Sequence, residues 1–187
     1  MTTKDSFVEC IRQCAEEMPT DSTAGFSALY DLVAHRLFRF AVVITSNPHD
    51  AEDAVQQVMV RVMDRPDLLA RAQFPWAYLL TIVRNEALGI LRRRKHEVRA
   101  DIAEFTTYCP VDELEREEQR RAVWRALQQL PPAQSEVVLL KVWEQLTFAE
   151  IAQVLSVHPE AAASRYRYAL ARLARFLGPR TEGVCHE

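Results

Sequence analysis

The sequence is poor in glycine, with 4 glycines and 9 prolines among its 187 residues. So few residues of these kinds exclude a collagen-like chain and disfavour a turn-rich all-β fold. No apolar run approaches the roughly 20 residues that a membrane span needs. The first residues, Met1 to Ser6, lack the basic and apolar stretches of a signal peptide. We therefore expect a cytoplasmic protein without membrane insertion.

The sequence also lacks any pattern of cysteines that would support a disulfide framework. Cys10, Cys14, Cys109 and Cys185 are scattered, with neither a Cys-x-x-Cys motif nor a nearby histidine pair. Cys10 and Cys14 would lie one helical turn apart and could bind a metal or oxidise, but two small half-buried side chains are favoured. No nucleophile elbow, phosphate-binding glycine loop or metal-ligand spacing is visible, so we expect no cofactor and no enzymatic activity.

Charge is unevenly distributed along an otherwise ordinary globular composition of 49% hydrophobic and 26% charged residues. Residues 25–96 and 119–187 each carry a net charge of +3, whereas residues 97–118 hold 2 basic and 8 acidic side chains. Positive charge concentrates at residues 92–95 and on the arginines between residues 165 and 180. Such clusters are typical of phosphate contacts, although solvated helix ends carry them as well.

Apolar residues recur at spacings of three and four, which predicts an all-α fold. Asn47 and Pro48 have the residue types of an N-cap and a first helical position, and Thr147 with Glu150 forms a capping-box pattern. Phe7, Ile11, Cys14 and Met18 would line one face of an additional N-terminal helix that packs on the body or binds a regulator, and packing is favoured. The sequence predicts further helices over residues 26–45, 48–64, 75–95, 111–130, 132–144, 148–155 and 159–177.

The last two of these helices have the arrangement of a helix-turn-helix motif, because a short capped helix is followed by a three-residue turn and a basic helix. In this motif the N-terminal part of the second helix faces base edges in the major groove. Arg165 and Arg167 can contact phosphate or guanine there, and the alanines that precede them allow close approach. Helical units without DNA-binding function share the pattern, so a purely structural unit is the alternative.

Two sets of motifs resemble bacterial RNA polymerase sigma factors. Residues 130–140, residues 146–152 and Ser164-Arg165 look like sigma region 4. Residues 37–41, the Asp50-Ala-Glu-Asp53 motif with Gln56, and residues 76–85 and 92–95 look like region 2. Since only these regions are present, in this order, the chain is similar to the extracytoplasmic-function group of the sigma-70 family.

The resemblance implies a division into an N-terminal extension at 1–24, region 2 at 25–96, an acidic linker at 97–111, region 4 at 112–178 and a tail at 179–187. It implies that core RNA polymerase binds region 2 through its β′ clamp helices and region 4 through its β flap. An anti-sigma factor is a further family expectation. The acidic linker would pass through the polymerase cleft, unless it is merely a solvated connection.

The resemblance also assigns residues to each surface. It places Asp50, Glu52, Asp53, Gln56 and Gln57 at the clamp helices. It assigns the minus-ten promoter element, with one base taken out of the stack, to Tyr78, Arg84, Asn85, Arg92, Arg93, Arg94 and Lys95. It assigns the minus-thirty-five element to Ala161, Ala162, Ser164, Arg165 and Arg167. Trp76 could stack on a base, but it falls in the apolar stripe and a core position is favoured.

Two departures from the family pattern concern region 4. Glu160-Ala-Ala-Ala163 stands where a Gly-Thr-Val-Lys/Arg sequence is usual, and Ser156 replaces the usual turn glycine. The first change removes a hydroxyl and a basic group and adds an acid near phosphate, which predicts weakened binding to the minus-thirty-five element. The interpretation is a sigma factor that directs core polymerase to promoters and helps to melt them. The alternative is a helix-turn-helix regulator that binds duplex DNA without polymerase.

Overall fold

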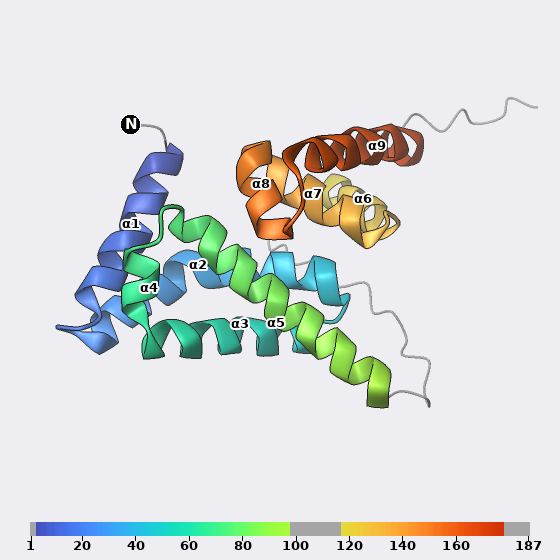
Figure 1. Cartoon of the computed structure of the whole chain (residues 1–187). Helices are drawn as coiled ribbons and strands as arrows, with labels where there is room; N and C mark the ends of the chain where they lie inside the picture. Colours follow the sequence, from blue (N-terminus) through green and yellow to red (C-terminus); the bar gives the residue numbers. More distant parts are fainter. Residues whose placement is uncertain (1–2, 98–116, 178–187) are drawn as a thin grey trace, which may run out of the picture.

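The computed structural model describes residues 3–97 and 117–177, and within them it contains helices and no strand (Figure 1). The all-α prediction is therefore confirmed. The linker that we expected at 97–111 falls beyond Glu97 outside the described residues, as does the tail at 179–187. The helices are α1 (Thr3–Glu17), α2 (Ser22–Thr45), α3 (Pro48–Asp64), α4 (Pro66–Ala70), α5 (Pro75–Glu97), α6 (Glu117–Gln128), α7 (Pro132–Val142), α8 (Phe148–Leu155) and α9 (Pro159–Leu177).

Helices α1 to α5 pack together as one unit (Figure 1). Its core is built from the apolar faces of α2, α3 and α5, whose side chains at the centre have no exposed surface. Among them are Leu29, Leu37, Phe40, Val58, Leu79, Leu80 and Val83. Trp76 is 2% exposed and belongs to this core, as its place in the apolar stripe predicts. The core fixes which faces of α3 and α5 remain available to partners.

Helix α1 is an integral part of this unit, because it contacts α2, α4 and α5. Ile11, Cys14 and Met18 are buried, as their spacing predicts, and Arg12 donates hydrogen bonds to the carbonyl oxygens of Ala70 (2.7 Å) and Ala72 (3.3 Å). Burial raises the pKa of the Cys14 thiol, and nearby negative charge raises it further.

Gly25 allows α2 to approach the end of α1 closely. A Cβ at this position would lie 3.0 Å from both the Cys14 carbonyl oxygen and the Met18 amide nitrogen. Contacts this short to the backbone of another helix leave no space for a side chain. The glycine is therefore required by packing rather than by its own backbone angles.

Several helix boundaries differ from those that the sequence predicts. Helix α2 begins at Ser22 and not at residue 26, because Asp21 caps it and accepts a hydrogen bond from the Ala24 amide (3.0 Å). Pro66 follows the end of α3 and also begins the short helix α4, which is not among the helices predicted from the sequence. A proline suits the first position of a helix, so one residue has both effects. Helix α7 ends at Val142, two residues before the expected boundary.

Helices α6 to α9 pack together as a second unit, and its buried side chains are continuous with those of the first unit. The capping box at α8 is confirmed, since the Thr147 hydroxyl accepts from the Glu150 amide (3.2 Å) and the Glu150 carboxylate accepts from the Thr147 amide (2.7 Å). Ser156 ends α8 in a left-handed conformation, with φ 54° and ψ 49°. The turn then directs the chain into α9, which gives the helix-turn-helix arrangement.

The two units lie directly against each other (Figure 1). Helix α8 contacts α5, and α7 contacts α2, whereas α9 lies on the side away from the first unit. The contact between the units therefore covers part of α5, the helix that carries the predicted minus-ten residues.

Candidate functional site

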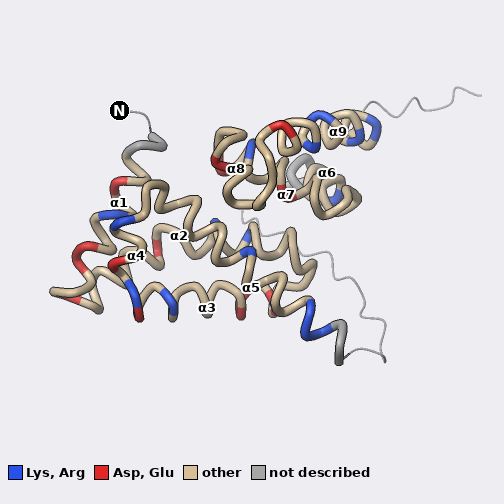
Figure 2. Tube along the Cα trace, in the orientation of Figure 1, with Lys and Arg blue, Asp and Glu red and all other residues tan. Residues whose placement is uncertain are grey.

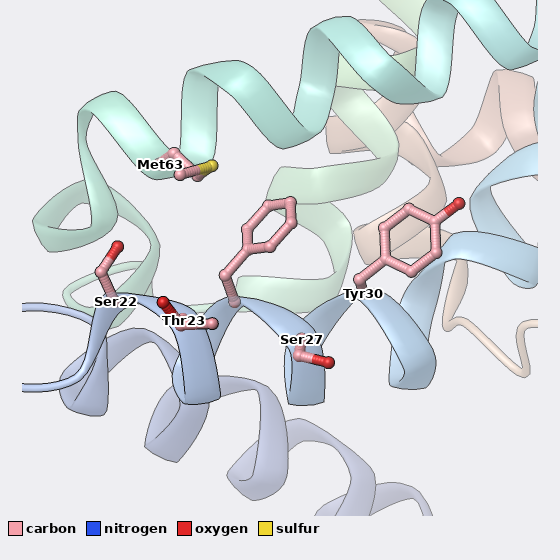
Figure 3. A pocket seen from close by; sticks show the side chains of 6 residues that line it. Ser22, Thr23, Ser27, Tyr30 and Met63 are labelled. Carbon is pink, nitrogen blue, oxygen red and sulfur yellow. The ribbon is translucent and has the colours of Figure 1, made fainter.

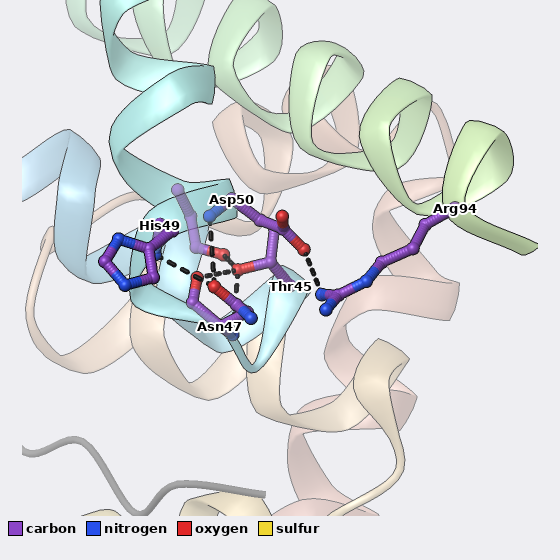
Figure 4. Close-up of polar contacts among 6 residues, drawn as sticks. Thr45, Asn47, His49, Asp50 and Arg94 are labelled. Carbon is purple, nitrogen blue, oxygen red and sulfur yellow. Dashed lines mark hydrogen bonds and ion pairs between the residues drawn. The ribbon is translucent and has the colours of Figure 1, made fainter. Parts of the chain in front are cut away.

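The start of helix α3 is fixed by a network of short polar contacts (Figure 4). The Asn47 side chain accepts hydrogen bonds from the amides of His49 (2.9 Å) and Asp50 (3.1 Å), which confirms it as the N-cap. The Thr45 hydroxyl donates to the Asn47 carbonyl oxygen (2.9 Å) and thereby holds the turn between α2 and α3. These bonds fix where α3 begins, and burial of its apolar face sets the direction of its polar face.

The outer face of α3 presents a compact polar surface. Glu52, Asp53, Gln56 and Gln57 are exposed, while Ala51, Ala54, Val55 and Val58 on the opposite face are buried. Because residues three and four apart are neighbours on a helix, the four polar side chains lie together. We call these four residues the α3 polar face.

Asp50 differs from the α3 polar face because it is already engaged within the molecule. Its carboxylate accepts a hydrogen bond from Nη1 of Arg94 on α5 at 2.7 Å, and its side chain is 17% exposed (Figure 4). The resemblance to sigma factors implies different surfaces for these two residues, one for polymerase and one for DNA. The structure joins them in an ion pair between α3 and α5, which no local sequence pattern signals.

Helix α5 separates its predicted DNA-contacting residues into distinct environments. Asn85, Arg92 and Arg93 are exposed, and Tyr78 is half-buried. Arg84 is 18% exposed and donates from Nε to the Glu136 carboxylate of α7 at 2.6 Å. Lys95 lies within α5, but its side chain is outside the described part of the structure.

The N-terminal part of α9 is only partly available for DNA. Ala161, Ser164 and Arg165 are half-buried, and exposed Arg167 donates to the Ser164 hydroxyl at 3.2 Å. Ala162 has no exposed surface and packs in the core of the second unit, so the expectation that it contacts DNA needs correction. Further along α9, basic residues follow one another toward the C-terminal end (Figure 2).

The interface between the two units contains a buried carboxylate that is not among the residues predicted from the sequence. Glu144, just after α7, is 1% exposed and lies between Arg36 and Arg39 of α2. Its Oε2 accepts from Nε (2.9 Å) and Nη2 (2.7 Å) of Arg36, and its Oε1 accepts from Nη2 of Arg39. The partners are more than 100 positions apart in the sequence, so helical periodicity gives no sign of the cluster.

A cavity of about 330 Å³ lies between α2 and α3. It is lined by Ser22, Thr23, Phe26, Ser27, Tyr30 and Met63 (Figure 3). The lining residues carry no charge and offer hydroxyl groups and apolar surface. Among the residues that the structure describes, no three His, Cys, Asp or Glu side chains come together as metal ligands. Within the same residues no helix is long and apolar enough to cross a membrane.

Comparisons with known proteins agree with this division into two helical units. Residues 27–97 match the family model "Sigma-70 region 2", and residues 120–173 match "Sigma-70, region 4". The chain is 31% identical over 144 residues to the RNA polymerase sigma-E factor of Streptomyces avermitilis, covering 77% of this chain and 80% of that protein. It is also 31% identical over 160 residues to the ECF RNA polymerase sigma factor SigM of Mycobacterium tuberculosis, covering 86% and 81%.

Solved structures show the same fold. The sigma factor RpoE of Bartonella quintana, determined in complex with the anti-sigma factor NepR, matches with a TM-score of 0.68 and 25% identity, covering 81% of this chain and 96% of that one. CnrH in complex with the cytosolic domain of CnrY matches with a TM-score of 0.61 and 21% identity, covering 90% and 97%. A match over 81% of the chain requires both units, since residues 3–97 make up about half of it.

The fold and its surfaces define a transcription protein with two helical units, one of which carries a helix-turn-helix. The chain belongs to the sigma-70 family of RNA polymerase sigma factors, in its extracytoplasmic-function group. It is a sigma factor, the class of initiation factor that binds core RNA polymerase and directs it to promoters.

Proposed function

We propose that the α3 polar face is the main docking surface for the β′ clamp helices of core polymerase. The observation that supports it most strongly is that Glu52, Asp53, Gln56 and Gln57 are all exposed on a helix whose other face is packed into the core. A fixed helix carrying two carboxylates and two amides suits a partner surface that is basic and rich in hydrogen-bond groups. Asp50 contributes to polymerase binding indirectly, because its ion pair with Arg94 orients α3 against α5.

A charge reversal on this face tests the assignment. Asp53→Lys should weaken binding to core polymerase tenfold or more, because a like charge would then face the partner. Glu16→Lys is the matched control, since Glu16 is an exposed acid on α1, away from the α3 polar face. Equal core affinity of the two variants, measured by titration of labelled protein with core enzyme, would refute the docking surface.

The proposal assigns the minus-ten element to the exposed side of α5. Asn85 is a suitable base reader, because its exposed amide can both donate to and accept from a base edge. Arg92, Arg93 and Lys95 would provide positive charge for the strand backbone. Arg84 and Arg94 belong to this group only after they leave their present carboxylate partners.

Replacing Asn85 separates promoter melting from polymerase binding. Asn85→Ala should retain core affinity and lose permanganate reactivity of promoter thymines, because the exposed base would lack its hydrogen-bond partner. Gln129→Ala, which removes an exposed amide at the end of α6, is the matched control and should melt promoters normally. Normal melting by Asn85→Ala would remove this residue from the proposed site.

The minus-thirty-five element is assigned to the N-terminal part of α9, through Ala161, Ser164, Arg165 and Arg167. Arg167 supports the assignment best, because it is exposed and its only described hydrogen bond is to the hydroxyl of Ser164. In the same proposal, region 4 also contacts the β flap of polymerase. The acidic linker passes through the polymerase cleft.

The proposal includes an anti-sigma partner and a cytoplasmic, non-enzymatic role. The anti-sigma factor is supported by the relatives, since RpoE of Bartonella quintana was solved with one bound. Co-purification of the tagged chain from its own cells, followed by competition with core polymerase, would identify such a partner. If the chain instead bound duplex DNA and ignored core polymerase, the alternative of a plain helix-turn-helix regulator would replace the proposal.

A further inference from the structure

Gly89 lies in the interior of α5, where neither backbone conformation nor packing requires a glycine. Of the four glycines in the sequence, Gly25 and Gly89 are the two that the structure describes, and neither has a positive φ. Gly25 is required by its contact with α1, whereas a Cβ at Gly89 would meet only Nη1 of Arg93 outside its own helix backbone, at 3.8 Å. Glycine destabilises a helix interior relative to alanine. Local structure therefore does not explain this glycine.

The residues next to Gly89 are those to which we assign the minus-ten element. Asn85 precedes it by four positions and Arg93 follows it by four, so the three residues share one side of α5. Asn85 and Arg93 are exposed, and Gly89 is half-buried. The missing side chain leaves the helix backbone uncovered between an amide that can pair with a base edge and a guanidinium that can bind phosphate. We call this uncovered stretch at Gly89 the Gly89 notch.

The charge around the Gly89 notch is positive, because the acid nearest to it along α5 is compensated. Glu86 lies three positions before Gly89, and its carboxylate accepts a hydrogen bond from Nη2 of Arg61 on α3 at 2.7 Å. The side chain of Glu86 is 19% exposed and that of Arg61 is 57% exposed. Arg92 and Arg93 are exposed and form no ion pair with any residue that the structure describes (Figure 2). These two arginines therefore dominate the charge that a ligand would meet.

Uncovered helix backbone beside two unpaired guanidinium groups suits the sugar–phosphate backbone of a single strand. Glycine occurs where the backbone of a ligand or another chain must approach closely. Single-stranded nucleic acid is bound in positively charged grooves that follow its phosphates. A strand in the Gly89 notch would place a phosphate near Arg93 and a base near Asn85. An acidic peptide would also satisfy the arginines, but it has no base edge for the Asn85 amide.

We propose that Gly89 admits the sugar–phosphate backbone of the unpaired promoter strand between Asn85 and Arg93, and thereby determines how closely the strand approaches α5. Arg61 is a positioning residue for this contact, since it directs the Glu86 carboxylate toward α3 and compensates its charge. The proposal rests on the assignment of the minus-ten element to α5. It extends that assignment to two further residues, one of which lies on α3.

Enlarging the side chain at position 89 tests the contact without polymerase. The full chain is titrated at low ionic strength into fluorescein-labelled, mixed-sequence single-stranded DNA, and binding is followed by anisotropy. Gly89→Ala should weaken binding about threefold and Gly89→Leu about tenfold, and the salt dependence should become shallower by about one phosphate. Both variants should still fold, because alanine and leucine favour helix. Ala28→Leu, which enlarges an exposed side chain on α2, is the matched control and should bind normally.

Three results of this titration would overturn the proposal. They are unchanged affinity of both Gly89 variants, an equal loss in Ala28→Leu, and no binding of the single strand by the unmodified chain. A polyglutamate peptide is titrated in parallel as an acidic protein ligand. If it bound as tightly as the strand and lost as much affinity in Gly89→Leu, the Gly89 notch would be assigned to an acidic protein partner instead.

The pair of Arg61 and Glu86 tests the charge argument separately. Arg61→Gln should weaken strand binding about threefold, because an uncompensated carboxylate would then lie beside the phosphates. Adding Glu86→Gln should restore the affinity, since the acid is removed with its partner. A pair that only joins α3 to α5 would be lost equally in the single and the double variant. Affinity that stays low in the double variant would therefore overturn the positioning role of Arg61.

Core polymerase distinguishes failure of this contact from failure of the sigma function. Gly89→Leu should bind core enzyme with unchanged affinity and reduce the permanganate reactivity of thymines in a promoter that the unmodified holoenzyme opens. Undiminished reactivity would overturn the proposal. Weakened strand binding by Gly89→Leu, together with no core binding by any form of the chain, would support the strand contact and contradict the sigma function.

Discussion

Replacing Ser156 by glycine should stabilise the helix-turn-helix unit. Ser156 adopts a left-handed conformation, with φ 54° and ψ 49°, at the end of α8. For a residue with a side chain this conformation costs roughly 1–2 kcal/mol. Glycine avoids that cost but loses roughly 0.5–1 kcal/mol through the greater freedom of the unfolded chain. The expected net gain in the free energy of unfolding is about 0.5–1 kcal/mol.

We expect Ser156→Gly to remove no stabilising hydrogen bond from the turn. The Ser156 amide bonds to the carbonyl oxygens of Ala152 and Gln153, and glycine retains that amide. Its side chain is exposed, and the described part of the chain shows no hydrogen bond from its hydroxyl. Urea unfolding followed by tryptophan fluorescence in a Trp76→Phe background reports the change, because the remaining Trp124 and Trp143 lie in this unit.

A second serine provides the matched control. Ser27 is exposed within α2, where a helical residue gains nothing from becoming glycine, so Ser27→Gly should cost about 0.5–1 kcal/mol. We expect Ser156→Gly to raise the free energy of unfolding and Ser27→Gly to lower it. If Ser156→Gly destabilised its unit as Ser27→Gly destabilises the other, the strain assigned to the turn would be refuted.

The remaining predictions concern the junction of α1 and α2. Gly25→Ala should lower the free energy of unfolding by about 1 kcal/mol, because overpacking against backbone costs roughly 1–3 kcal/mol and improved helix propensity returns about 1. Gly89→Ala, whose nearest contact is the flexible end of a side chain at 3.8 Å, should instead be stabilising, and equal effects in urea titrations would refute the packing argument. Burial raises the pKa of Cys14, so its thiol should resist iodoacetamide at pH 8 while exposed Cys10 reacts. Because the unfolded thiol ionises first, near pH 8.5, the contribution of Cys14 to stability should be complete below that pH and decline as pH rises further. Equal alkylation of the two thiols in the native protein, seen by peptide mass spectrometry, would contradict this burial.

The helices could be predicted because their determinants are local. Asn47 with Pro48 and Thr147 with Glu150 mark helix starts through contacts within four residues, and the structure contains both. The start of α2 was misplaced because Asp21, its N-cap, precedes the apolar stripe on which the prediction relied. Local signals thus identify an element more reliably than its first residue.

Contacts between distant segments could not be read from the sequence. The Asp50–Arg94 pair spans 44 positions, and the Arg36–Glu144 pair spans 108. In the sequence, each of these charged residues fits a solvent-exposed position on a helix as well as it fits an ion pair. The sequence pattern therefore cannot tell a paired charge from a solvated one. Ala162 shows the same limit, because position in a recognition helix does not tell which side faces the core.

Binding of the purified full chain to bacterial core RNA polymerase, followed by transcription from a genomic promoter library, tests the central claim most directly. We expect a stable complex with core enzyme and transcripts that begin at a defined set of promoters, whose shared sequence would supply the minus-ten and minus-thirty-five motifs. Direct binding to duplex DNA with no affinity for core polymerase, and no new start sites, would contradict the account.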